Sequence, residues 1–272
     1  MNKAQPPRYI MESDDEATRL DMKTDSARLA GQALWAGILP GMRAADIGCG
    51  SGKTTAYLHQ LIQPGGSIVG VDGSASRISH ATERYGTDGI DFVRGNLYEP
   101  LDELGKFDFI WVRFVLEYHR AGSRGIVQNL SGLLRPGGIL CLIDLDYNCL
   151  THFGLSPRLE NAINGIMKTL EMEHDFDPYL GRKLYSFLYD LDFREIAVDV
   201  GMHHLIYGPL DPVDEYNWTK KVEVAARNSG YGFEGYPGGY DEFVEEYKNF
   251  FADPRRFTYT PVISCRGIKP PP

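Results

Sequence analysis

Three glycines and two acidic residues between positions 46 and 72 have the types and spacing of a nucleotide-binding site. Asp46, Gly48, Gly50 and Gly52 alternate with other residues directly after an apolar stretch, and Asp72 closes the next apolar stretch. A glycine-rich turn lets the backbone approach a ligand closely, and a carboxylate at the end of the following strand suits ribose hydroxyls. The spacing therefore indicates a β-α-β nucleotide site.

The same spacing excludes two common glycine loops. A P-loop needs G-x-x-x-x-G-K-[ST], and Gly52-Lys53-Thr54 supplies its end, but Ile47 stands where the first glycine is required. A dinucleotide loop needs G-x-G-x-x-G, and Lys53 occupies the position of its third glycine. A glycine-rich turn without any ligand is the structural alternative.

What remains, the Asp-x-Gly-x-Gly-x-Gly run over 46–52, closely resembles the first motif of class I S-adenosylmethionine-dependent methyltransferases. Two further stretches are similar to patterns of this family: the Phe-Asp run over 107–114 and the Leu-Leu-Arg-Pro-Gly-Gly run over 133–138. The resemblance extends over residues 43–144. It implies S-adenosylmethionine as the cofactor and a small molecule as the methyl acceptor.

The resemblance also implies which residues contact the cofactor: Tyr9, Asp46, Gly48, Cys49, Gly50, Asp72, Gly73, Asn96, Leu97, Arg113 and Phe114. Asp72 would take the ribose hydroxyls, the region of Asn96 the adenine, and Arg113 with the glycine loop the methionine end. Asp46 would shape the loop. Two of these positions have a structural alternative, because Tyr9 could pack on the surface and Gly-Asn is a common turn pair.

A general base is optional for methyl transfer, since alignment of the nucleophile supplies much of the rate. The candidates follow the fourth and fifth predicted strands: His119, Glu117, His152 and Tyr147. Neutral histidine accepts a proton near pH 7, but no motif supports any of these residues, and each has a structural alternative. Asp144 and Asp146 could bind a metal, but a further Asp-Asn pair is missing, so we expect none.

Five apolar stretches alternate with helical patterns, which predicts parallel strands joined by right-handed crossovers. The predicted strands are 43–47, 67–71, 90–94, 107–113 and 139–144, and longer period-two patterns follow near 196–206 and 257–265. The fold class is α/β: a doubly wound, mostly parallel seven-stranded sheet with an antiparallel last strand. This is the Rossmann-like fold that the resemblance implies.

The chain divides into five predicted parts around this sheet. They are an N-terminal segment over the cofactor (1–25), the cofactor-binding core (26–146), a helical lid (147–190), the last two strands (191–208 and 257–269) and a second helical insertion that caps the substrate (209–256). The inserted helices carry apolar faces and an aromatic loop, which favours a large or planar acceptor. We interpret His203 and His204 as structural.

Composition excludes several classes of partner. The net charge of −9 and the pI of about 5.3 argue against nucleic acid binding, which needs a basic surface. No apolar run is long enough to span a membrane, and the N-terminus does not resemble a signal peptide. The four cysteines lack metal spacing and are expected to be reduced thiols of a cytoplasmic protein.

Two other functions compete with methyl transfer. One is a catalytically silent S-adenosylmethionine-binding regulatory protein that has kept the site. The other is a nicotinamide-dependent oxidoreductase, which the glycine spacing disfavours. The acceptor, the attacking atom (O, N or C) and the oligomeric state are left open by the sequence, with a homodimer as one option.

Overall fold

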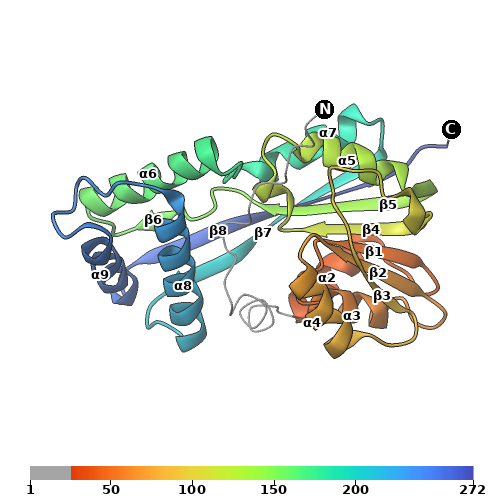
Figure 1. Cartoon of the computed structure of the whole chain (residues 1–272), viewed down its shortest axis with the longest axis horizontal. Coiled ribbons are helices and arrows are strands. Elements are labelled where there is room, and N and C mark those ends of the chain that lie inside the picture. The colour runs from red at the N-terminus through yellow and green to blue at the C-terminus, as the bar shows by residue number, and fades with distance from the viewer. Residues whose placement is uncertain (1–25, 272) are drawn as a thin grey trace.

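Parallel strands joined by helices form the centre of the protein in the computed structural model, which describes residues 26–271 (Figure 1). The strands are β1 (Arg43–Ile47), β2 (Ser67–Asp72), β3 (Ile90–Arg94), β4 (Phe107–Arg113) and β5 (Leu134–Leu145). The helices of this part are α2 (Ser26–Ala36), α3 (Lys53–Leu61), α4 (Ala75–Tyr85) and α5 (Ser123–Gly132). The predicted segment 1–25, with Tyr9, lies outside the described residues.

The strand order is β3-β2-β1-β4-β5-β8-β6, with β7 (Arg194–Tyr207) paired to β8 (Phe257–Ile268). Neighbours among β1 to β5 run parallel, whereas β8 runs antiparallel to both β5 and β7. This confirms the predicted fold class. The sheet has eight strands instead of seven because the two-residue β6 (His152–Phe153), which the sequence did not predict, also pairs with β8.

Helices cover both faces of the parallel sheet, and the alternation of side chains along each strand explains why. In β4, Ile110 and Val112 pack against the cluster that includes Leu130 of α5. Phe109 and Trp111 point to the opposite face, where Leu58 of α3 packs. β4 is therefore apolar on both faces, as expected for a parallel strand buried between two helical layers.

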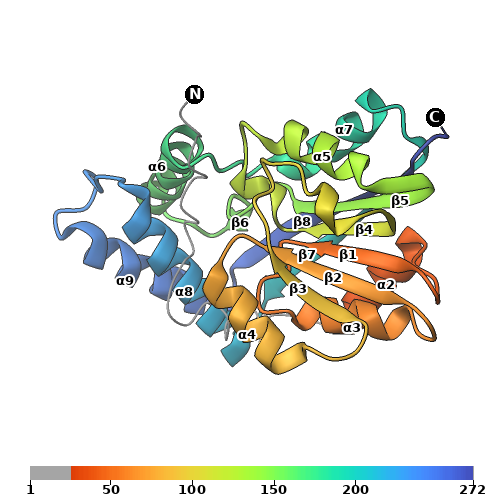
Figure 2. The same cartoon turned by 45° about the vertical axis from the view of Figure 1, so that its right-hand side comes forward.

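A third apolar cluster lies outside the sheet and belongs to α6 (Pro157–Glu173), α8 (Pro212–Ser229) and α9 (Gly239–Ala252). We call residues 147–176 and 208–256 the cap. Figures 1 and 2 place these helices together on one side of the parallel sheet, with β7 and β8 running from the sheet into the cap. The chain enters the cap directly after β5, so the cap lies off the carboxyl ends of the parallel strands, where ligands of open α/β sheets bind.

The predicted lid over 147–190 is too long at its C-terminal end. Its last part forms the short helix η3 (Leu180–Lys183) and α7 (Leu184–Asp190), and Leu180, Leu184 and Leu188 are buried in the core cluster on the α5 face of the sheet. The apolar periodicity of this segment was correct. The periodicity does not show against which surface this segment packs.

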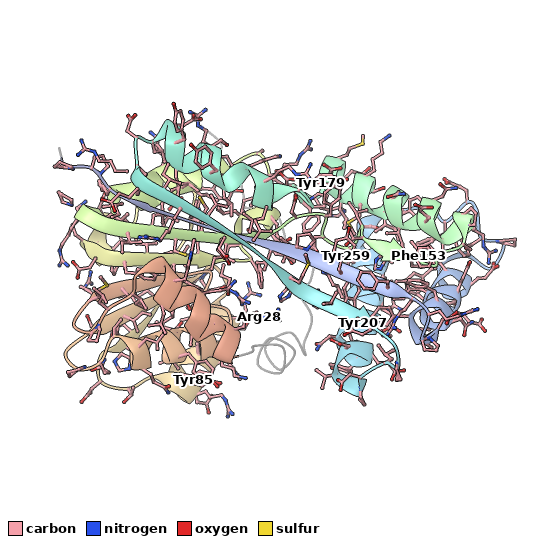
Figure 3. The ribbon with its side chains drawn as sticks, turned by 180° about the vertical axis from the view of Figure 1, so that it is seen from behind. Arg28, Tyr85, Phe153, Tyr179, Tyr207 and Tyr259 are labelled. Carbon is pink, nitrogen blue, oxygen red and sulfur yellow. The ribbon has the colours of Figure 1, made fainter. Side chains whose placement is uncertain are left out.

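Two strand predictions also differ in detail. The strand predicted over 139–144 begins earlier, because β5 already starts at Leu134, and its pairing jumps from Phe107↔Leu134 to Phe109↔Ile139 across an irregularity at Pro136. Along β8 the buried face is formed by residues such as Thr258, Thr260 and Val262, and the apolar alternation is on the more exposed face. Figure 3 shows Tyr207 and Tyr259 along this part of β7 and β8.

Within residues 26–271, no helix is long and apolar enough to cross a lipid bilayer. The four cysteines are free and buried.

Candidate active site

The glycine loop turns the chain sharply between β1 and α3. Gly48, Gly50 and Gly52 have φ values of +73°, +55° and +86°, a region that L side chains rarely adopt. A Cβ atom on Gly48 would lie only 2.3 Å from Cγ2 of Val115, in the segment that follows β4. The loop therefore needs glycine here for its backbone conformation and for its close approach to the neighbouring segment.

Asp72 is the last residue of β2 and is 7% exposed. Its Oδ2 accepts a hydrogen bond from Gly50 N (3.1 Å), and its Oδ1 accepts from Ser74 N (2.8 Å) and from Arg77 Nε (3.1 Å). A carboxylate offers about four acceptor positions, so room remains at Oδ2 for a further donor. To accept hydrogen bonds from two ribose hydroxyls, Asp72 would have to use Oδ1 for a hydroxyl as well as for Arg77, or give up its hydrogen bond with Arg77.

Asp46 lies beneath the loop and is 2% exposed. Its Oδ2 accepts a hydrogen bond from the Thr55 hydroxyl of α3 at 2.7 Å, which ties the loop to the helix. Burial raises the pKa of Asp46 to about 7, and Asp72 adds to this, while Thr55 and Arg113 act in the opposite direction. Cys49 next to it is 6% exposed, and burial raises its thiol pKa, so the thiol stays protonated.

The loops after β2 and β3 lie side by side. Gly95 N donates to Asp72 O (3.0 Å), and Arg94 Nε donates to Gly73 O (3.1 Å). Half-buried Asn96 uses Oδ1 to accept from Tyr98 N at 3.2 Å, as an Asx turn does, and this leaves its amide N–H donors for another group. The structure thus brings the predicted adenine-side residues to the same sheet edge as Asp72.

The end of β4 carries Arg113 and Phe114. The guanidinium of Arg113 lies 4.0 Å from the centre of the Phe114 ring, and Phe114 has an unusual positive φ of 59°. Strained backbone of this kind concentrates at functional sites. The Phe114 ring also contacts His203 of β7, with ring centres 4.7 Å apart, so the last strands support the end of β4.

The base candidates lie in different surroundings. His119 Nδ1 is 2.9 Å from the Tyr98 hydroxyl, on the loop after β3, and burial lowers its pKa, opposed by nearby Asp175. In β6, His152 contacts Thr258 Oγ1 through Nδ1 (2.9 Å) and Cys149 O through Nε2 (3.2 Å).

A carbonyl oxygen can only accept, so Nε2 of His152 must carry the proton, and Nδ1 accepts from the Thr258 hydroxyl. Burial lowers the pKa of His152 to about 4, which keeps it neutral. Neither nitrogen has a lone pair left for a substrate. This arrangement disfavours the predicted role of His152 as a base. It is the arrangement expected of a histidine that packs in the interior.

Part of the chain matches a known protein family. Residues 45–140 match the profile of the family described as Methyltransferase domain. An uncharacterised methyltransferase of Synechocystis is 33% identical over 110 residues, which cover 40% of this chain and 49% of that protein. A ubiquinone biosynthesis O-methyltransferase of Bradyrhizobium is 33% identical over 112 residues, covering 40% of this chain and 42% of that protein.

Residues 45–140 therefore match a methyltransferase domain, in agreement with the resemblance of the sequence to class I S-adenosylmethionine-dependent methyltransferases. The matched segment holds the glycine loop, Asp72 and the end of β4, which are the features that carried the resemblance. It spans half or less of the length of each of the first curated relatives.

The fold is similar to that of a solved methyltransferase. A phosphoethanolamine N-methyltransferase of Haemonchus contortus, solved in complex with S-adenosyl-L-methionine, superposes with a TM-score of 0.59 and 15% identity, covering 99% of this chain and 61% of that chain.

A buried polar cluster lies between β4, β5 and the cap. Glu117, in the short helix η2 (Leu116–Tyr118), is 2% exposed, and its N–H donates to Asp144 Oδ2 (3.2 Å) at the end of β5. Burial and the neighbouring Glu117 raise the pKa of Asp144 well above its ordinary value. Asp144 therefore keeps its proton at pH values at which an exposed carboxyl group is ionised.

Asn148 joins Glu117 to the cap. Its Nδ2 donates to Glu117 Oε2 (2.7 Å), and its Oδ1 accepts from Lys221 Nζ of α8 (2.6 Å). We call Glu117, Asn148 and Lys221 the amide bridge. Of these three residues only Glu117 was predicted as a site residue, because residues so far apart in the chain share no motif or spacing that could reveal their contact.

Asp146, which was weighed as a metal ligand, forms an ion pair with Arg182, whose Nε lies 2.8 Å from Oδ1. In the described part of the chain, no group of three or more His, Cys, Asp or Glu residues is placed to hold a metal ion. Tyr147, the remaining base candidate, is 42% exposed and stacks edge-on against Tyr179.

A cavity of about 40 Å³ lies within the cap and reaches the amide bridge. Its core-side wall is formed by Tyr118, after β4, and by Asn148, after β5. The other walls are side chains of α6, α8 and α9, almost all apolar, such as Met167, Trp218 and Phe243. The volume is enough for about three water molecules.

Proposed function

We propose that this chain transfers a methyl group from S-adenosylmethionine to a small, largely apolar organic molecule held between the core and the cap. The observation that carries the proposal is the position of the cap cavity. Residues that follow β4 and β5, Tyr118 and Asn148, form its core-side wall, and the same strand ends carry the family's cofactor loops. An acceptor in this cavity would lie next to the methyl donor.

The residues at the sheet edge fit the cofactor. The glycine loop has no side chain to obstruct a nucleoside, Asp72 keeps room for a hydroxyl donor at Oδ2, and the Asn96 amide can donate to adenine. When bound, S-adenosylmethionine supplies a methyl group on a positively charged sulfur, which is electrophilic. Asp46 would help to shape the loop beneath it.

The remaining work of this chain is to position the acceptor and to exclude water. Apolar cap side chains surround the cavity, and fixing the acceptor's nucleophile in line with the methyl group supplies much of the rate. Which residue, if any, acts as the general base and takes a proton from the methyl acceptor is part of this proposal. His152 lines the cavity but uses both ring nitrogens. Glu117 is the candidate that remains, since Asn148 links it to the cavity wall, whereas His119 faces Tyr98.

The names of relatives support a small acceptor. The ubiquinone biosynthesis O-methyltransferase of Bradyrhizobium bears the name of a small-molecule pathway. The net charge of −9 also disfavours a nucleic acid substrate.

Two measurements on the purified protein test the proposal. Isothermal titration calorimetry with S-adenosylmethionine and S-adenosylhomocysteine measures cofactor binding. Transfer of a radiolabelled methyl group to a panel of aromatic acids, phenols, amines and quinols measures turnover. We expect binding of both cofactor forms and turnover on at least one acceptor class. Binding without turnover on any acceptor would favour a silent regulatory protein, and binding of NAD alone would overturn the family assignment.

A further inference from the structure

The sheet face that α7 covers continues along β8 beyond α7. Near the end of β8, Cys265 belongs to the core cluster, and a Cβ atom on Gly267 would lie 3.3 Å from Cδ1 of Leu188 in α7. Because every second residue of a strand points to the same side, the earlier part of this face carries Ile263, Pro261, Tyr259 and Phe257. None of these four is buried, and none belongs to an apolar cluster of the described residues.

β7 extends this uncovered face with large apolar side chains. Residues paired across antiparallel strands point to the same side, and an irregularity between Met202 and His204 keeps both halves of the β7 row on the side of Tyr259. The five side chains of this row are 42–64% exposed: Val198, Val200, Met202, Leu205 and Tyr207.

The opposite face of β8 is polar and nevertheless buried. Thr258, Thr260 and Ser264 are at most 1% exposed, and their hydroxyl groups lie within hydrogen-bonding distance of other side chains, those of His152, His204 and Gln32. In an antiparallel sheet with one face in water, the apolar residues belong on the buried face. The reversed arrangement in β7 and β8 is therefore that of strands covered on both sides.

Aromatic rings from three strands close one end of the uncovered face. Phe257 of β8 pairs with Tyr207 of β7 and with Phe153 of β6, and Phe257 and Phe153 are 41% and 73% exposed. We call Phe153, Phe257 and the five residues of the β7 row the bare face. Figure 3 views this part of the sheet from the side without the cap helices and labels Phe153, Tyr207 and Tyr259.

The area of the bare face decides whether it needs a partner. Its seven side chains expose roughly 750–850 Å², above the ~300–600 Å² of the largest apolar patch on a typical monomer. The same area matches the ~800 Å² that each partner contributes to a standard protein–protein interface. The bare face is therefore large enough to hold a stable dimer together.

The charge of the protein narrows the choice of partner. The bare face contains no charged residue, whereas the chain has a net charge of −9. Peripheral binding to an anionic lipid surface depends on Lys and Arg, so the negative charge disfavours a membrane. An uncharged apolar face needs no opposite charge on its partner, and it is complementary to an identical face.

We propose that the bare face is the interface of a homodimer, in which the two copies pack these sheet faces together about a two-fold axis that crosses the strands near Met202. The ends of the face differ in size, with the rings of Phe153, Tyr207 and Phe257 at one end and two valines at the other. The two-fold axis places the rings of each copy over the valines of its partner, so that large side chains meet small ones.

Analytical ultracentrifugation of the full-length protein tests the dimer. Interfaces of this size have Kd values from micromolar to picomolar, so at about 50 µM we expect twice the mass of the 30.5 kDa chain. A monomer at this concentration would overturn the proposal and leave the bare face to a different protein.

Matched variants locate the interface. Val200→Lys and Leu205→Lys each place two charges in the apolar contact of a dimer, and an exposed edge strand tolerates lysine. We expect each to raise the dimer Kd by roughly 100-fold or more. Met172→Lys, at a 71% exposed apolar residue of α6, is the control and should leave the Kd unchanged. Circular dichroism checks that all three variants are folded. A folded Val200→Lys protein that dimerises like the wild type would overturn the proposal.

Crosslinking tests the position of the two-fold axis. The four native cysteines are buried, so Met202→Cys adds a single reactive thiol, which the axis brings close to its own copy in the partner. A short bismaleimide should join Met202→Cys into covalent dimers, and it should leave the control Met172→Cys monomeric. Equal crosslinking of the two variants would overturn the proposed packing.

Discussion

Gly48 must be glycine for two reasons: its backbone conformation and the lack of space for a side chain. Its φ is +73°, and a Cβ atom would lie 2.3 Å from Cγ2 of Val115, whereas Gly41 has a φ of +82° with nothing within 4 Å of the added carbon. Gly41→Ala should therefore cost only the left-handed backbone, about 1–2 kcal/mol. Gly48→Ala should cost a further 1–3 kcal/mol, roughly, for overpacking.

Urea unfolding of both variants measures this difference. Val115→Ala in the Gly48→Ala background should recover part of the extra loss, because it removes the atoms that the new methyl group meets. Equal losses in the two glycine variants would contradict the close approach.

Asp72 carries the prediction for cofactor affinity. We expect Asp72→Ala to weaken binding of S-adenosylmethionine by about 1.5–3 kcal/mol, the scale of hydrogen bonds to charged groups. Calorimetric titration measures the change, and Asp91→Ala, which removes an exposed carboxylate from neighbouring β3, is the control. Unchanged affinity in Asp72→Ala would remove Asp72 from the cofactor site.

Asp46 makes the stability of the protein depend on pH in an unusual direction. Its pKa is raised from 3.8 to about 7 by burial, so between these values the native state holds a proton that the unfolded chain has lost. Stability falls with rising pH wherever the native state binds more protons. Relative to Asp46→Asn, the wild type should lose up to about 1.4 kcal/mol per pH unit across this window.

Denaturant unfolding of both proteins at about pH 5, 6 and 8 measures the difference in their free energies of unfolding. We expect this difference to change with pH below the folded-state pKa of Asp46 and to stay constant above it. A difference that stays constant over this range would mean that Asp46 is ionised throughout.

At the scale of elements, the amide bridge joins η2 and the end of β5 to α8 of the cap. Asn148 is 1% exposed and bonds both Glu117 and Lys221. Asn148→Ala should lower the free energy of unfolding by about 1–3 kcal/mol, because it takes a bond from a buried carboxylate. It should also slow methyl transfer while cofactor affinity stays within about twofold, since Asn148 lines the cavity.

Asn161→Ala on the exposed side of α6 provides the control, and both variants are compared by urea unfolding and single-turnover methyl transfer. A stability effect without any effect on transfer would make the amide bridge purely structural.

At the scale of the whole molecule, β8 links the core to the cap through one continuous strand. Its N-terminal residues pair with β6 in the cap, its C-terminal half pairs with β5 in the core, and β7 runs beside it along most of its length (Figure 1). Local unfolding of the cap would therefore break pairs of a strand that the core also needs. We expect one cooperative unfolding transition for both parts.

The tryptophans allow this to be measured. Trp35 and Trp111 lie in the core, and Trp218 lies in the cap. The Trp218→Phe variant reports core unfolding by fluorescence, and the double variant Trp35→Phe/Trp111→Phe reports the cap. In each variant, the midpoint of the fluorescence transition should coincide with the midpoint of the circular dichroism transition. Separated fluorescence midpoints would show that the cap unfolds independently.

Much of the core was accessible to sequence reasoning because its signals are local. The strands over 43–47 and 107–113 were predicted with the bounds that β1 and β4 have, since apolar runs between glycine and proline signals determine them. The glycine loop and the position of Asp72 at the end of β2 were predicted for the same reason: local spacing argues against a P-loop or a dinucleotide loop, and the cofactor role that the resemblance implies stays a prediction.

Only the tertiary structure decided which surfaces the later elements cover and which polar groups meet. Periodicity found α7, yet its packing on the sheet instead of the cap depends on contacts distant in sequence. The contact of Asn148 with Lys221 joins residues 73 positions apart, which no local pattern encodes. The sequence by itself thus determined the core strands, the glycine loop and the resemblance to a methyltransferase family, whereas the cap cavity arises from long-range packing.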